Sequence, residues 1–135
     1  MQARFLTELD TRWVPRDTDA PWLEKSSRKY MLLAPLAVEI DGEWYEVPTG
    51  YIYDQSSVPK VARMFYSPGF HEAARASAVH DYLYSHLWQT VSKEFADSAL
   101  RALMLADNAS YGDARRFYWA THLFGKGGWS HGGVL

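Results

Sequence analysis

The sequence contains no cysteine among its 135 residues. This absence excludes disulfide bonds, thiolate nucleophiles, iron–sulfur clusters and zinc sites built on thiolates. Charged residues are also few, at 22%, and 14 basic against 16 acidic residues give a net charge of −2. No run of lysine or arginine forms a stripe for binding phosphates, so nucleic acid is not an expected partner.

Long apolar runs are missing as well. The main uncharged apolar stretch, residues 30–38, is interrupted by Pro35 and falls far short of the roughly 20 residues that a membrane helix needs. Charged residues, among them Asp10, Arg12 and Arg16, are scattered through the first twenty positions, where a signal peptide would need an apolar segment. We therefore expect neither a transmembrane segment nor an export signal.

Apolar and aromatic residues are abundant, at 47% and 16% of the chain. This content is enough to build a core, and the length suits one compact domain. We expect a single domain over residues 1–135, in which residues 125–135 form a Gly-rich C-terminal tail.

The two halves of the chain differ in periodicity. Residues 3–9, 29–40 and 44–53 look extended, and Asp41-Gly42 is a hairpin signal between the last two stretches. Apolar residues then recur every three to four positions, which predicts helices over residues 70–88, 92–108 and 114–124. The short linker between the first two helices predicts an antiparallel helical hairpin. The expected class is α+β, with a small antiparallel sheet followed by three helices.

Two polar segments stand out from this framework. In the first, VPTGYIYDQSSVPK at residues 47–60, Asp54, Ser56 and Ser57 precede a proline. Small polar residues at such a place cap helices and close turns. Asp54 is equally suited to ligate a hard cation or to orient a histidine, and both interpretations stay open.

The second polar segment is AVHDYLY at residues 78–84. On a helix, His80 and Asp81 diverge by about 100°, so they must have different roles. Asp97 on the neighbouring helix is placed to reach across to the imidazole, which would leave the other ring nitrogen of His80 to act as a base. Asp81 could then bind calcium through oxygen. The alternative is a histidine satisfied by a buried hydrogen bond beside a solvated Asp81.

These two segments resemble the signature of a known family. VPTGYIYDQSSVPK, AVHDYLY and the following FADSALRALM are similar, in that order, to domain of unknown function 1353, a family of small proteins encoded in tailed bacteriophages and prophages. The resemblance runs from about residue 32 to residue 125. It implies phage or prophage origin and brings no agreed activity.

A more distant similarity suggests a chemistry. The pattern His80-Asp81-x-x-Tyr84 followed by Ala96-Asp97 is similar to that of phospholipases of the secreted and parvoviral kind. The resemblance implies that His80 activates water, that Asp97 orients His80 and that Asp81 binds calcium, with zinc a weaker candidate. Those enzymes have a glycine-rich calcium loop, whereas residues 50–59 contain one glycine, so Asp54 would have to replace the loop carbonyls.

Two functions of different kinds follow. The first is a hydrolase centre for cation-assisted ester hydrolysis, with His80 and Asp97 as candidate catalytic residues and Asp81 and Asp54 as candidate metal ligands. The second is a non-catalytic virion component or tail-assembly protein, which the aromatic content favours. In either case we expect the protein in the host cytoplasm or the virion, with other phage structural proteins or further copies of itself as partners.

Overall fold

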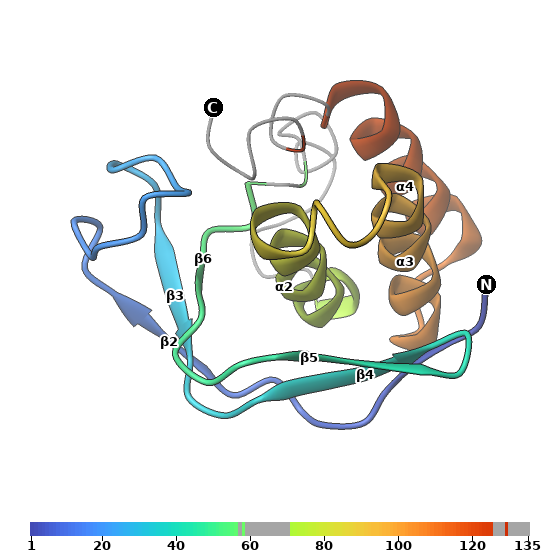
Figure 1. The fold of residues 1–135 in the computed structure, drawn as a ribbon. Helices are drawn as coiled ribbons and strands as arrows, with labels where there is room; N and C mark the ends of the chain where they lie inside the picture. Colours follow the sequence, from blue (N-terminus) through green and yellow to red (C-terminus); the bar gives the residue numbers. More distant parts are fainter. Residues whose placement is uncertain (57, 59–70, 126–128, 130–135) are drawn as a thin grey trace.

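The structure is a computed structural model that describes residues 1–56, 58, 71–125 and 129, and it has an α+β fold (Figure 1). Strands precede helices along the chain, as predicted. The elements are β1 (Ala3–Phe5), β2 (Thr11–Val14), β3 (Lys29–Leu32), β4 (Leu36–Ile40), β5 (Glu43–Val47), β6 (Ile52–Tyr53), α2 (His71–His86), α3 (Lys93–Ala106) and α4 (Tyr111–Phe124).

The predicted single sheet is in fact two antiparallel sheets of three strands. The first sheet has the strand order β1-β4-β5, and the second sheet has the order β2-β3-β6. Two stretches predicted as continuous strands are each divided between the sheets. The first divides at Pro35, which lacks an N–H to donate, and the second near Gly50, whose φ of +88° does not fit a strand. Strand β2 lies between the stretches 3–9 and 29–40, where the sequence predicted no strand.

The hairpin at Asp41-Gly42 is confirmed. Both residues have positive φ, +50° and +84°, and Ile40 pairs with Glu43 directly across the turn. Positive φ at both central positions is the backbone twist of a two-residue hairpin, and the Asp-Gly pair adopts it readily. The turn fixes the register of β4 against β5.

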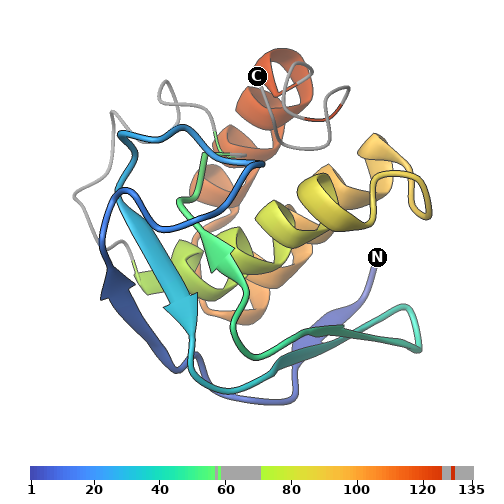
Figure 2. The same cartoon turned by 60° about the vertical axis from the view of Figure 1, so that its left-hand side comes forward.

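The core lies between the first sheet and the helices. Leu36, Val38 and Ile40 of β4 point to the core at every second position, and Ala37 on the other face of the strand is buried as well. Helix α3 supplies buried residues of its own, including Leu100 and Leu103, and packs against β1. In both views α2 and α3 lie side by side over this sheet (Figure 1, Figure 2).

The helices begin near their predicted positions. Ser92 is the N-cap of α3 and accepts a hydrogen bond from the Phe95 N–H, whereas α4 begins at Tyr111, three residues before its predicted start. The predicted Gly-rich tail lies outside the described residues except for Gly125 and Trp129. None of the helices among the described residues is long and apolar enough to cross a membrane.

Candidate functional site

Asp97 is the centre of a buried polar cluster that we call the Asp97 hub, made of His80, Tyr84, Lys93 and Asp97. One carboxylate oxygen, Oδ1, lies 2.8 Å from His80 Nε2 and accepts a hydrogen bond of 2.6 Å from the Tyr84 hydroxyl. The other, Oδ2, accepts a hydrogen bond of 2.6 Å from Lys93 Nζ. His80 and Asp97 are fully buried, so this carboxylate has exchanged water for three protein donors.

Helical spacing assembles the hub. His80 and Tyr84 are four residues apart on α2, and Lys93 and Asp97 are four residues apart on α3, so each pair shares a helix face. Lys93 Nζ also donates to the backbone carbonyls of Thr121, at 2.9 Å, and His122, at 3.2 Å, in the last turn of α4. The hub therefore joins all three described helices. Its ammonium group adds to the Gly125 N–H at the Thr121 carbonyl and places a positive charge at the C-terminal end of α4.

The hub fixes the protonation state of His80. Burial lowers the pKa of His80 below its ordinary value of 6.5, and the neighbouring Asp97 carboxylate only partly opposes this effect. His80 is therefore neutral at pH 7. Because an ionised carboxylate can only accept, the hydrogen on the imidazole is assigned to Nε2, and Nδ1 carries the lone pair. This tautomer is the one that a general base acting through Nδ1 requires.

Asp97 remains ionised inside the protein. Burial raises the pKa of Asp97, but hydrogen bonds from His80, Lys93 and Tyr84 outweigh it and bring the pKa below its ordinary value of 3.8. The pKa of Tyr84 is raised, chiefly by burial and then by the charge of Asp97, so Tyr84 keeps its proton and remains a donor. One negative charge, one ammonium group and two neutral donors make up the hub at pH 7.

The two candidate metal ligands bind backbone amides. Asp81 Oδ2 accepts a 2.6 Å hydrogen bond from the Gln55 N–H, and Asp54 Oδ1 accepts a 2.8 Å bond from the Ser56 N–H. Asp54 thus closes a turn on its own segment, as one interpretation of the sequence proposed, and Asp81 is buried rather than solvated. Gln55 lies between them with a φ of +65°.

The residues that the structure describes do not fit a calcium or zinc site. Among them, no group of three or more His, Asp or Glu side chains is arranged to hold a metal ion. Calcium takes six to eight oxygen ligands, and two carboxylates that already hold backbone amides fall well short of that number. Ser57 lies outside the described residues.

The sequence predicted the contact between His80 and Asp97, and the structure contains it. It did not predict Lys93, although Lys93 stands four residues before Asp97, a spacing at which opposite charges pair on a helix. Nor did it associate the end of α4 with the site. His122 Nδ1 lies 3.9 Å from Asp97 Oδ2, and Gly125 packs closely beside Tyr84.

A family model described as "protein of unknown function (DUF1353)" matches residues 30–121. The chain belongs to this family. The matched region contains the whole Asp97 hub as well as Asp54 and Asp81, which confirms the resemblance seen in the two sequence segments. No curated protein and no solved structure matches this DUF1353 chain.

Proposed function

We propose that this DUF1353 protein is a hydrolase in which His80 is the general base and Asp97 is the residue that positions it. The observation that carries the proposal is the 2.8 Å contact between His80 Nε2 and Asp97 Oδ1. Burial lowers the pKa of this histidine. A neutral imidazole in one tautomer, oriented by a carboxylate, is the arrangement on which general-base catalysis by histidine depends.

The proposed reaction is the hydrolysis of an ester by water. His80 Nδ1 takes a proton from water while the oxygen adds to the ester carbonyl carbon. The tetrahedral intermediate then breaks its bond to the alcohol oxygen, and the proton passes from His80 to that oxygen, giving a carboxylic acid and an alcohol. Asp97 stabilises the transient imidazolium. Because the described residues do not fit a metal site, no step is assigned to calcium.

The proposal is tested with 4-nitrophenyl butyrate and with phosphatidylcholine vesicles, each in EDTA and in calcium chloride. We expect turnover in EDTA that falls by roughly 10²–10⁴-fold in His80→Gln, the range typical of a general base. The rate should rise with pH up to the His80 pKa and level off above 6.5, and Asp97→Asn should alter this profile. His86→Gln, outside the hub, is the matched control.

Absence of turnover on both substrates, or equal turnover in wild type and His80→Gln, would contradict the proposal. Circular dichroism of each variant separates loss of chemistry from loss of fold. Turnover that appears only with calcium would instead return Asp81 and Asp54 to the role of metal ligands.

The second candidate is a non-catalytic virion or tail-assembly protein. The observation that favours it is the complete burial of His80 together with the way that Lys93 joins α3 to the end of α4. In this case the hub is a structural lock, and His80→Gln costs stability on the order of 1–3 kcal/mol with no activity to lose. Urea unfolding of the same variant, beside the ester assay, distinguishes the two functions.

Phage or prophage origin is part of both proposals. It is supported by the order and spacing of the two segments that resemble the family signature. The host cytoplasm and the virion are the corresponding locations, and immunoblots of purified particles and of the lysate from an induced host would distinguish them.

A further inference from the structure

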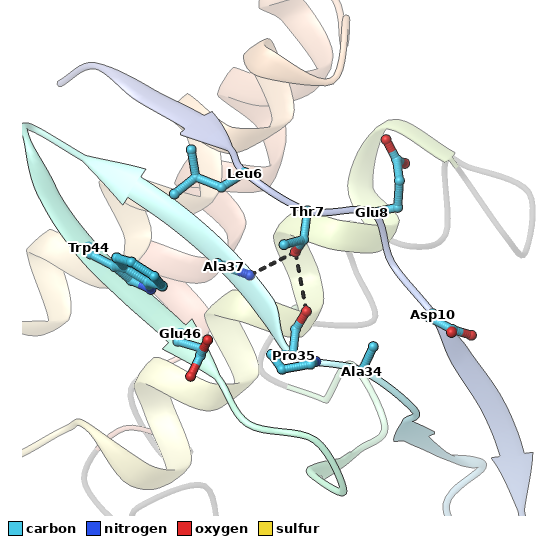
Figure 3. Close-up of a pocket in the computed structure, with 9 residues that line it drawn as sticks. All are labelled: Leu6, Thr7, Glu8, Asp10, Ala34, Pro35, Ala37, Trp44 and Glu46. Carbon is cyan, nitrogen blue, oxygen red and sulfur yellow. Dashed lines mark hydrogen bonds between the residues drawn. The ribbon is translucent and has the colours of Figure 1, made fainter.

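The face of the first sheet that points away from the helices is hollowed by a groove of about 650 Å³ (Figure 3). Its floor is Ala37 of β4, whose side chain is small and lies between larger neighbours on both sides. Leu6, just after β1, stands on one side. On the other side, Glu46 of β5 lies directly across from Ala37, and Trp44 lies two residues away along β5. A small residue between two large ones at the centre of a sheet face produces the hollow.

Hydrogen bonds hold the groove open in advance of any ligand. The Thr7 hydroxyl accepts a hydrogen bond of 2.9 Å from the Ala37 N–H and donates one of 3.2 Å to the Pro35 carbonyl. The Leu6 N–H donates to the Ala37 carbonyl at 2.9 Å. The bend at Pro35 and the segment after β1 are thereby fixed to β4, and a pre-formed site loses less entropy on binding.

The charge around the groove has one sign. Glu8, Asp10 and Glu46 line it, and no lysine, arginine or histidine does so among the described residues. Arg75 Nη1 lies 3.7 Å from Glu8 Oε2. Because the Glu8 side chain is 96% exposed, this pairing leaves the carboxylate in water. The rest of the lining is mainly apolar, and Trp44 is 68% exposed.

An apolar floor inside an acidic rim suits one kind of side chain. Arginine and lysine bury an aliphatic stem and keep a charged head at the edge, where carboxylates can bind it. The exposed face of Trp44 adds a surface over which a guanidinium group can stack. A groove of this volume exceeds one side chain, so it accommodates a segment of several residues.

We propose that this groove docks an arginine-bearing peptide segment of a partner protein, with Trp44 as the stacking surface and Glu46, Glu8 and Asp10 as the carboxylates that select for positive charge. The site lies on the opposite face of the first sheet from the helices that carry the Asp97 hub. It therefore does not depend on whether His80 is catalytic.

The test is fluorescence anisotropy with a labelled nonapeptide of alternating arginine and alanine, titrated with the full chain. The same peptide with glutamate in place of arginine is the control ligand. We expect saturable binding of the arginine peptide that weakens as salt is raised. Trp44→Ala should weaken it at least tenfold, and Glu46→Gln at least threefold.

Matched variants away from the groove make the result specific. Trp119→Ala removes another partly exposed tryptophan, on α4, and Glu94→Gln removes another carboxylate, on α3; both should change the affinity less than twofold. Absence of saturable binding, or equal weakening by groove and control variants, would overturn the proposal. So would self-association of the wild type that Trp44→Ala abolishes, since the occupant would then be a second copy.

Discussion

Replacing Asp97 by asparagine tests the Asp97 hub most severely. The change keeps the shape of the side chain and removes its charge, so the Lys93 ammonium loses its counter-ion. The asparagine NH₂ group also replaces one carboxylate oxygen, so at least one of the three donors to Asp97 then faces another donor. Removing one partner of a buried ion pair destabilises a protein by about 3–5 kcal/mol. Lys93 is 19% exposed and keeps two backbone carbonyls, so we expect the lower end, about 3 kcal/mol.

For a chain of this length, about 3 kcal/mol lowers the melting temperature by roughly 10 °C. Thermal and urea unfolding at pH 7 measure the change. Glu39→Gln is the matched control, because its ion pair with Arg4 is exposed and contributes less than about 1 kcal/mol. Stability of Asp97→Asn equal to that of Glu39→Gln would refute the hub as the joint between the helices.

Acid should weaken the same joint. The pKa of Asp97 is lowered in the folded state, so its contribution is present above the ordinary value of 3.8 and is lost as the pH falls through the folded pKa. The stability difference between wild type and Asp97→Asn should therefore shrink below about pH 4. Urea unfolding repeated from pH 7 to pH 3 measures this trend, and a difference independent of pH would contradict it.

Three further predictions concern the histidines of α2, Gly125 and Lys29. Burial lowers the pKa of both His80 and His86, so the free energy of unfolding should fall as the pH drops below 6.5. In His80→Gln, the free energy of unfolding in urea should depend less on pH between 6.5 and 5, and an unchanged slope would contradict this. Gly125→Ala places a Cβ 2.6 Å from a backbone oxygen and 2.9 Å from the Tyr84 hydroxyl, so it should lower the melting temperature despite an ordinary φ of −85°. Lys29 is buried and donates hydrogen bonds to four backbone carbonyls of residues 16–27. Lys29→Met should lower the free energy of unfolding by about 1–3 kcal/mol and speed amide hydrogen exchange in residues 16–27. Exchange rates equal to those of the wild type would refute this.

The sequence was most informative where one local rule decided the outcome. The Asp41-Gly42 hairpin depends on the backbone preferences of two residues, and it is present. The division into two sheets could not be predicted in this way. Pro35 and Gly50 mark the breaks in the two predicted strands, but tertiary packing decides which sheet each half joins.

In the candidate site too, local spacing could be interpreted from the sequence, whereas contacts that depend on tertiary packing could not. Helical spacing and the hairpin topology were enough to predict that Asp97 reaches His80. The partners of Asp54 and Asp81 were harder, because a carboxylate that caps a turn and one that binds a cation occupy similar places in a sequence. Lys93 was missed because its second role, at the end of α4, depends on how α3 and α4 pack.

The protonation of His80 tests the central claim most directly. Nitrogen-15 NMR of the imidazole at pH 7, with His80→Gln used to assign the signals, distinguishes the two neutral tautomers from the imidazolium. We predict a neutral ring with its hydrogen on Nε2, no hydrogen on Nδ1 and a pKa below 6.5. A hydrogen on Nδ1 at pH 7, in either a neutral or a charged ring, would contradict a general base acting through Nδ1.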